Sequence, residues 1–275
     1  LGARRSLLAL AESLDPTRWR PVVCGQSFGQ LGEECATREI PMRVINLGWW
    51  RKGKYFLWRP FAISRLASLA RSVAADLIHC NEIYPNPYAV RAVRNVPAPE
   101  DSPLANHPIP VITHVRLNLK PKMIRKYDLE SADRIITVSE SIRDEFEEWP
   151  DRNERVSVIY NGVNLKEFQR SRSPQEARKL LELPEEGFVI CAPGQLGPRK
   201  GGDIILDAFE ELVLGNQDIY LVMVGNPHKG QEKFADMLRR RAGQPRLSGR
   251  VFIRPFTEII VPYYEAADLN LLISR

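Results

Sequence analysis

Short runs of β-branched and other apolar residues alternate with amphipathic, helix-like runs along most of this 275-residue chain. In the first half, the pattern predicts strands over residues 21–24, 42–47, 77–80, 110–115, 134–139 and 156–160. Between them it predicts helices over residues 6–14, 61–74, 88–94, 124–131 and 141–149. Two parallel strands must be joined by a long crossover, which is usually a helix. The alternation therefore indicates a parallel sheet covered by helices on both faces.

The same alternation starts again in the second half of the chain. Strands are predicted over residues 188–192, 220–225, 251–256 and 269–273, and helices over 201–214 and 231–241. Asn161-Gly162 supplies a turn between the two sets, and Ser173-Pro174-Gln175-Glu176 has the composition of a helix start. Five prolines in residues 97–110 predict a loop within the first set. We therefore predict an α/β fold with two Rossmann-like, doubly wound domains, at residues 1–165 and 166–275.

Composition and charge narrow the class of protein. Hydrophobic residues make up 44% of the chain and charged residues 27%. This composition is typical of globular proteins and excludes a disordered or fibrous protein. A net charge of +5 suits phosphate-bearing substrates, but it is too low for a dedicated nucleic-acid binder. The four cysteines form no C-x-x-C pair, and no apolar run approaches the length of a membrane span. We expect a cytoplasmic protein without a metal site or a nucleic-acid partner.

A glycine-rich turn lies between the predicted strand 188–192 and the following helix. It reads Gly194-Gln195-Leu196-Gly197-Pro198-Arg199-Lys200-Gly201-Gly202. Glycines allow backbone N–H groups to approach an anion closely, and a helix N-terminus adds partial positive charge. Two cations stand in the same turn, so the segment is a candidate phosphate-binding site. The alternative is an ordinary strand-to-helix turn with solvated basic residues.

Four segments of the second half, in order, resemble motifs of the family 4, GT-B glycosyltransferases. Residues 158–168 resemble the interdomain segment V-I-x-N-G-V-D-x-x-x-F, and residues 194–201 resemble G-R-L-x-x-x-K-G. Residues 221–225 resemble L-x-I-V-G, and residues 264–275 resemble Y-x-x-A-D-x-x-x-x-P-S-R. The first half fits the family more loosely. The resemblance implies the GT-B fold, in which two such domains face a cleft.

The resemblance also implies donor-binding residues in the second domain. The positions of Arg199 and Lys200 would hold the diphosphate of a nucleotide sugar, and Gln195 stands where the family usually has arginine. Glutamine forms weaker hydrogen bonds to a charged group, so Arg199 is expected to compensate. The turns after the next two predicted strands would approach the nucleotide. The predicted donor-binding residues are Gly194, Gln195, Arg199, Lys200, Gly225, Asn226 and Phe256.

In the first domain, similar enzymes carry a histidine that meets the transferred sugar. His114 or Arg116, at the end of the predicted strand 110–115, would occupy this position and act on the charge that develops on the leaving phosphate. The alternative for His114 is a hydrogen-bonded histidine at a strand end. The acceptor-side residues are expected to be Asn81 and Glu82 after the strand 77–80, together with Gly2, which resembles part of a glycine-containing loop.

Relative to the family pattern, we expect both ends of the chain to be truncated. Leu1-Gly2-Ala3-Arg4-Arg5 stands where the family has the loop after its first strand, so the first domain is expected to lack that strand. The sequence ends at Ser274-Arg275, where a paired-glutamate motif would begin in the family. The second domain is therefore expected to be incomplete.

The resemblance implies a retaining, metal-independent enzyme of glycan or polysaccharide biosynthesis. It would move a hexose-type sugar from a UDP- or GDP-linked donor to a glycan, a lipid or a small-molecule acceptor, and it would need no cofactor. A GT-B epimerase or phosphorylase would share the phosphate site, and a non-catalytic sugar-nucleotide-binding fragment stays open. A nicotinamide-binding protein is disfavoured, because the turn lacks the G-x-G-x-x-G spacing.

Residues 49–59 combine three tryptophans with several cations. Aromatic rings at the level of lipid headgroups, with cations toward anionic lipid, are typical of proteins that lie on a membrane surface. The segment therefore suggests peripheral contact with the inner face of the membrane, beside a lipid-linked acceptor. The alternative is a loop in which the tryptophans pack on the domain and the cations remain solvated.

Overall fold

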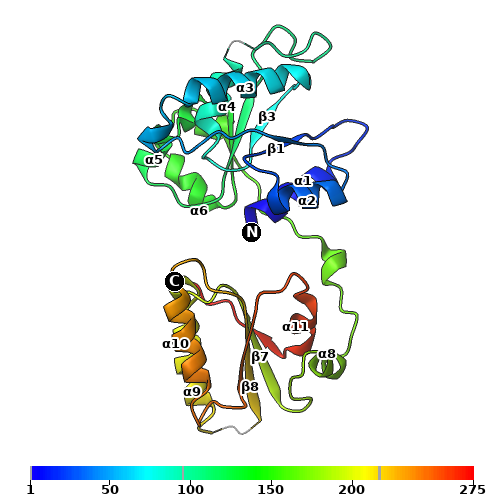
Figure 1. Cartoon of the computed structure of the whole chain (residues 1–275), viewed down its shortest axis with the longest axis vertical. Coiled ribbons are helices and arrows are strands. Elements are labelled where there is room, and N and C mark those ends of the chain that lie inside the picture. Colours follow the sequence, from blue (N-terminus) through cyan, green and yellow to red (C-terminus); the bar gives the residue numbers. More distant parts are fainter. Residues whose placement is uncertain (1, 95, 216–217) are drawn as a thin grey trace. The chain divides into compact units, whose positions relative to one another are not determined.

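The computed structural model describes residues 2–94, 96–215 and 218–275 and divides into two compact units (Figure 1). One unit ends at Val163, and the second runs from Asn164 to Arg275. The sequence placed the division two residues later, after residue 165. Within the described residues, no helix is long and apolar enough to cross a lipid bilayer.

The second unit is built on a four-stranded sheet in which all strands are parallel. Its strands are β7 (Phe188–Pro193), β8 (Ile219–Val224), β9 (Val251–Arg254) and β10 (Leu269–Asn270). Their order across the sheet is β10-β7-β8-β9. All four strands correspond to predicted ones. Since the strands are parallel, their carboxyl ends meet at one edge of the sheet.

Helices cover both faces of this sheet (Figure 1). They are α8 (Pro174–Leu180), α9 (Gly202–Leu212), α10 (Glu232–Ala242) and α11 (Val261–Ala266). In β8, Leu221 and Met223 pack in the core formed with α9 and α10, whereas Val222 and Val224 pack in the core formed with α8 and α11. Strand residues point alternately to opposite faces, so a continuous apolar run fills both cores. The prediction of a doubly wound sheet is confirmed for this unit.

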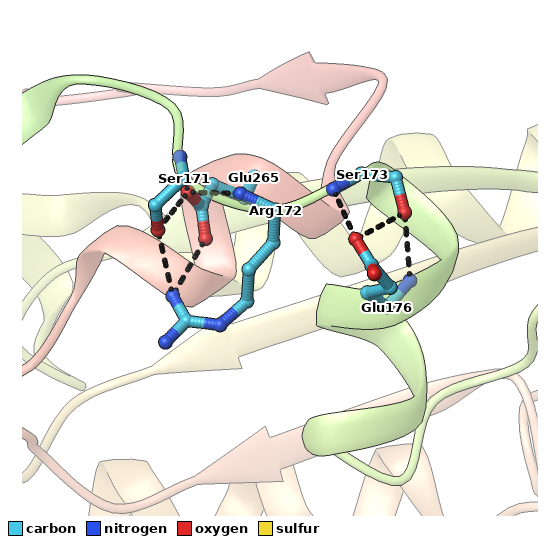
Figure 2. A network of polar contacts seen from close by, with 5 residues as sticks. All are labelled: Ser171, Arg172, Ser173, Glu176 and Glu265. Carbon is cyan, nitrogen blue, oxygen red and sulfur yellow. Dashed lines mark hydrogen bonds and ion pairs between the residues drawn. The ribbon is translucent and has the colours of Figure 1, made fainter.

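A capping box begins the first helix of the second unit, as the sequence predicts. The Ser173 Oγ accepts a hydrogen bond from the Glu176 backbone N–H, and the Glu176 carboxylate accepts one from the Ser173 N–H (Figure 2). The preceding two residues are held by Glu265 of α11, which is buried. Its carboxylate accepts hydrogen bonds from the backbone N–H groups of Ser171 and Arg172 and pairs with the Arg172 guanidinium (Figure 2). These contacts fix where the chain enters the second unit.

The first unit contains two separate parallel sheets. β1 (Val23–Gly25) pairs only with β2 (Met42–Val44). The larger sheet has the order β3-β4-β5-β6, formed by β3 (Ile78–Cys80), β4 (Val111–Val115), β5 (Arg134–Thr137) and β6 (Val156–Val158). All six predicted strands are present. The alternation implied a single sheet, but the structure has two. No ladder of hydrogen bonds joins the described strands β1 and β2 to β3–β6.

Helices of the first unit vary widely in length, from 4 to 14 residues. They are α1 (Gly2–Ser13), α2 (Gly29–Thr37), α3 (Arg59–Ser72), α4 (Asn86–Val93), α5 (Pro121–Lys126), α6 (Glu140–Arg143) and α7 (Arg152–Arg155). Short 3₁₀ turns of the first unit are η1 (Gly53–Tyr55), η2 (Leu129–Ser131) and η3 (Asp144–Phe146), and those of the second unit are η4 (Leu165–Phe168) and η5 (Pro198–Lys200). The proline-rich residues 97–110 form no helix, as predicted.

Three departures from the predicted helices have local causes. The helix predicted over residues 124–131 breaks at Asp128, whose backbone is left-handed with φ of 52°. The side-chain amide of Asn86 stabilises this break by donating to the carbonyls of Tyr127 and Asp128. The helix predicted over 141–149 ends at Arg143 and continues as η3. Helix α2 was missed, because two glycines, a cysteine and a threonine, all of low helix propensity, stand among its nine residues.

Candidate functional site

The predicted donor-binding residues lie together at the carboxyl edge of the second unit's sheet. Asn226, which follows β8, connects the end of this strand to the ends of β7 and β9. Its carbonyl accepts a hydrogen bond from the Leu196 N–H at 3.1 Å, and its side-chain oxygen accepts one from the Phe256 N–H at 3.2 Å. The ends of β7, β8 and β9 are therefore bound to one another through a single residue. Phe256 is 41% exposed there and presents an aromatic ring to solvent.

Gly225 sits at the closest approach between two of these strand ends. A Cβ added there would lie 1.9 Å from the carbonyl oxygen of Gly194, which is far inside van der Waals contact. The Gly225 N–H donates to the Arg254 carbonyl and the Gly194 N–H to the Val224 carbonyl, so neither loop is free to retreat. The glycine predicted from the sequence is required here by backbone packing.

The glycine-rich turn uses most of its backbone N–H groups internally. Those of Gly194, Leu196, Gly197, Lys200 and Gly201 all donate to carbonyls of the second unit. The Gln195 N–H has no such partner among the described residues, and the Gln195 side chain is exposed. An anion at this turn would therefore meet the side-chain cations and the few amides that remain, rather than the ring of amides that the glycines suggested.

Lys200 and Arg199 differ in how the turn holds them. The aliphatic stem of Lys200 passes over Gly194, with Cγ and Cδ both 3.6 Å from the position of an added Cβ. Its Nζ donates to the Ser274 Oγ at 3.3 Å. Arg199 is exposed, and within the described residues its guanidinium has no hydrogen-bond or ionic partner. Lys200 is thus pre-positioned at the strand end, while Arg199 is a free cation beside it.

Arg275 forms hydrogen bonds to the same turn, a role that the sequence did not reveal. Its N–H donates to the Arg199 carbonyl at 2.9 Å, and its guanidinium reaches the Pro198 carbonyl at 3.2 Å. The same guanidinium pairs with Asp203 in the first turn of α9 at 2.7 Å. Residues 274–275 had been noted only for their resemblance to a family motif. Their contacts show that this segment positions η5 and the lysine that ends it.

A polar network occupies the carboxyl ends of β3, β4 and β6 in the first unit. The guanidinium of Arg116 donates to the carbonyl of Asn81 at 3.0 Å and to its side-chain oxygen at 2.8 Å. It also donates to the side-chain oxygen of Asn161 at 2.7 Å and contacts Nδ1 of His114 at 3.1 Å. Arg116 therefore binds three strand ends together. This geometry makes it a positioning residue for its neighbours, with little donor capacity left for a substrate.

The contact with Arg116 fixes the tautomer of His114. A guanidinium can only donate, so Nδ1 of His114 is the acceptor and the neutral ring carries its proton on Nε2. Burial, reinforced by the positive charge of Arg116 and by His79, lowers the pKa of His114 to about 4. His114 is only 7% exposed, and its Nε2 has no partner among the described residues. At neutral pH, His114 is therefore a hydrogen-bond donor without charge.

The three predicted acceptor-side residues have different surroundings. The Asn81 side-chain N–H donates to the carbonyl of Ala3 at 2.9 Å, which ties α1 to the end of β3. Glu82 is half-buried, and its charge acts on Arg116. Gly2 begins α1 and does not lie in a loop. Nothing lies within 4 Å of a Cβ added to it, so glycine is not required at this position.

Comparisons with known proteins identify both halves of the chain. A family model described as Glycosyltransferase Family 4 matches residues 2–167, and one described as Glycosyl transferases group 1 matches residues 173–275. The chain belongs to glycosyltransferase family 4. The family resemblance read from the motifs is thereby confirmed.

Curated relatives of this family 4 chain match over limited segments. The D-inositol 3-phosphate glycosyltransferase of Salinispora tropica is 32% identical over 126 residues, covering 42% of this chain and 26% of that protein. The lipopolysaccharide 1,2-N-acetylglucosaminetransferase of Salmonella typhimurium is 32% identical over 78 residues, covering 28% of this chain and 20% of that protein. The matches thus span a fifth to a quarter of these two relatives.

Solved structures match the family 4 chain over nearly its whole length. Anabaena HepE in complex with UDP has a TM-score of 0.79 and 22% identity, covering 100% of this chain and 71% of HepE. A glycosyltransferase from Rickettsia africae has a TM-score of 0.78 and 18% identity, covering 99% of this chain and 69% of that one. These likenesses confirm the predicted GT-B fold class.

Burial strongly affects two of the thiols in this family 4 chain. Burial raises the pKa of Cys80 and of Cys191 to about 12, so neither thiolate forms near neutral pH. All four cysteines are free thiols. Across the described ranges, no three His, Cys, Asp or Glu side chains gather in a group that could hold a metal ion.

The stability of the family 4 chain is expected to fall as the pH drops below about 6.5, the ordinary pKa of histidine. The folded His114 has a pKa of about 4, so the unfolded chain binds more protons between these pH values. The free energy of unfolding therefore rises with pH between about 4 and about 6.5, and the stabilisation that His114 contributes is fully present above about pH 6.5. His114→Gln is expected to remove about 2 kcal/mol of the difference in unfolding free energy between about pH 7.5 and about pH 5.

Urea unfolding at the two pH values measures this effect. His79 stacks on His114 with ring centroids 5.6 Å apart, and burial, with the nearby Arg116, lowers its pKa too, so a smaller pH dependence should remain in His114→Gln. The matched control is His107→Gln, because His107 is exposed. An unchanged pH dependence in His114→Gln would contradict the assignment.

Proposed function

We propose that the chain is a retaining glycosyltransferase that moves a hexose from a UDP- or GDP-linked donor to a glycan, lipid or small-molecule acceptor. The observation that carries the proposal is the group of residues at the carboxyl edge of β7, β8 and β9, with Lys200 held over Gly194. Ligands of open α/β sheets bind at this edge. Membership of family 4 supports the same conclusion.

The second unit would hold the donor. Lys200 and the free guanidinium of Arg199 would neutralise the diphosphate, and Phe256 and Asn226 would flank the base. Between the two nucleotides, UDP is favoured, because HepE structures of the same fold were solved with UDP and with UDP-glucose. The exposed Gln195 would add a neutral hydrogen bond at a position where the family usually has arginine. Arg199 is therefore expected to supply the positive charge that is missing at residue 195.

The chain's residues would favour departure of the diphosphate. In the proposed reaction, the bond between the anomeric carbon and the diphosphate oxygen breaks, and the acceptor oxygen bonds to the same carbon. The hydroxyl proton passes to the departing diphosphate, so the acceptor enters on the face from which the diphosphate leaves and the configuration is retained. Lys200 would stabilise the charge that develops on the diphosphate. The Nε2–H of His114, kept neutral by burial, would donate a hydrogen bond to a sugar hydroxyl.

Two measurements test the proposal. Thermal shift with UDP, GDP and ADP is expected to show the largest stabilisation by UDP, since a ligand at 100 times its Kd stabilises by about 2.7 kcal/mol. Incubation with UDP-sugars, with and without candidate acceptors, then separates the functions. Acceptor-dependent release of UDP supports transfer, isomerised sugar nucleotide without acceptor indicates an epimerase, and binding without turnover indicates a non-catalytic protein. No stabilisation by any of the three nucleotides would refute the donor site.

A further inference from the structure

A solvent-exposed apolar tip lies at the start of α3 in the first unit. It is formed by Phe56, Leu57, Trp58 and Phe61, which are 64%, 89%, 39% and 50% exposed. Leu57 is the most exposed large apolar residue among those the structure describes. The rings of Trp58 and Phe61 lie 4.7 Å apart, and all four residues fall within residues 56–61. Leaving such a patch in water is unfavourable, which indicates that something covers it.

Contacts beneath the tip hold it in place. Trp50 packs edge-on against the buried Tyr88, with ring centroids 5.0 Å apart. The guanidinium of Arg59 lies between Trp50 and Phe56, at 4.3 Å and 5.3 Å from the two ring centroids, and donates to the Trp50 carbonyl. The Trp58 indole N–H donates to the Asn46 carbonyl at 3.0 Å. Trp50 therefore belongs to the core, as the alternative interpretation of this segment had it, while Phe56, Leu57 and Phe61 point outward from a rigid base.

Exposed cations lie in the same segment as the tip, and this segment contains no acid. Residues 40–75 contain seven lysines and arginines and no aspartate or glutamate. Arg51, Lys52, Lys54 and Arg65 are all exposed, and within the described residues none of them forms an ion pair. Instead they lie over aromatic rings: Arg51 and Lys52 over Trp49, Lys54 over Tyr55 and Arg65 over Phe61. The local charge is thus strongly positive and available to an external anion.

We propose that this surface, the apolar tip with Arg51, Lys52, Lys54 and Arg65, docks the chain on an anionic lipid bilayer. Phe56, Leu57 and Phe61 would enter the boundary between headgroups and acyl chains, and the four cations would lie at the level of the lipid phosphates. This inference goes beyond sugar transfer, because it rests on exposure and charge and uses no residue of the proposed donor site.

Two other partners fit the surface less well. Single-stranded nucleic acid stacks its bases on open aromatic faces, but cations cover the rings of Trp49 and Tyr55. A protein partner needs about 800 Å² on each side, which is more than four neighbouring side chains provide. A lipid surface needs only a few inserted apolar residues and diffuse cations, and both are present here.

Vesicle co-sedimentation of the full chain tests the proposal. Binding is expected to vesicles of phosphatidylcholine with about 30 mol% phosphatidylglycerol, and to weaken strongly in pure phosphatidylcholine and at about 0.5 M salt. Phe56→Ser/Leu57→Ser is expected to lower the partition coefficient at least about tenfold, since two exposed apolar side chains are lost. Lys52→Ser/Lys54→Ser is expected to lower it about tenfold on anionic vesicles only.

Leu214→Ser is the matched control, because Leu214 is 65% exposed in the other unit, and it should bind like the unaltered chain. No binding to anionic vesicles, or equal binding by Phe56→Ser/Leu57→Ser, would overturn the proposal, as would an equal loss in the control. Thermal shift with UDP should be the same in all these variants. Loss of vesicle binding with an intact UDP shift therefore bears on the docking surface alone, whereas absence of the UDP shift bears on the proposed function alone.

Discussion

Replacing Lys200 by methionine is expected to lower kcat/KM for sugar transfer by about 10²–10³-fold, the loss typical when one preorganised charge-stabilising donor is removed from an active site. The physical reason is the position of the ammonium group. Its stem is held over Gly194 and its Nζ lies 3.3 Å from the Ser274 Oγ, so the charge is in place before a ligand arrives. Methionine keeps the aliphatic packing and removes only the charge. Acceptor-dependent release of UDP measures the effect.

Two further variants provide a control and a comparison for Lys200→Met. Lys179→Met changes an exposed lysine of α8 and should leave kcat/KM unchanged. Arg199→Met should weaken UDP binding about fivefold, because its guanidinium is exposed and has no fixed position. An unaltered UDP affinity in Arg199→Met would show that this arginine does not compensate for Gln195. Full activity in Lys200→Met would remove the basis of the proposed donor site.

The strands and the site edge could be predicted because their signals are local. β7 and β8 are continuous apolar runs, and each buries alternate residues in a different core, so their hydrophobicity alone marks them as central parallel strands. The Ser173 capping box uses residues three apart and forms as its sequence indicates. Once the strands are known to be parallel, the residues that follow them must meet at one edge. Gly194, Lys200, Gly225 and Asn226 gather there for this reason.

The network around Arg116 could not be predicted, because its contacts join distant parts of the chain. Arg116 meets Asn81 across 35 residues and Asn161 across 45, and no periodic pattern encodes such pairs. The neutral state of His114 depends on the same contacts. Helix α11 was likewise missed, since its Val261-Pro262 start has no capping side chain and its six residues are too few to show a period.

Arg178 is the second residue that sequence reasoning overlooked, and its replacement is expected to have the largest effect on stability. Arg178 lies on α8, and its side chain is 5% exposed. Its guanidinium donates to the carbonyls of Ala266, Glu185 and Gly187 and pairs with Asp268 at 2.6 Å. Asp268 also accepts a hydrogen bond from the Val189 N–H, at the start of β7. One arginine therefore joins α8, the turn before β7 and the segment after α11.

Arg178→Met is expected to lower the unfolding free energy of the second unit by about 3 kcal/mol, because it leaves the Asp268 carboxylate and three carbonyls without their partner. Hydrogen exchange of the β7 and β8 amides in the full chain measures the free energy of that unit. Arg239→Met is the matched control, since its pair with Asp236 is about half exposed on both sides and should cost less than about 0.5 kcal/mol.

A double-mutant cycle then separates the charge pair from the hydrogen bonds to carbonyls. Asp268→Asn removes the carboxylate charge and keeps an oxygen for the Val189 N–H. Arg178→Met/Asp268→Asn should therefore cost less than the sum of the two single changes, because no unpaired carboxylate remains next to the buried methionine. Strictly additive costs would mean that the pair itself contributes nothing and that Arg178 acts only through the carbonyls of residues 185, 187 and 266.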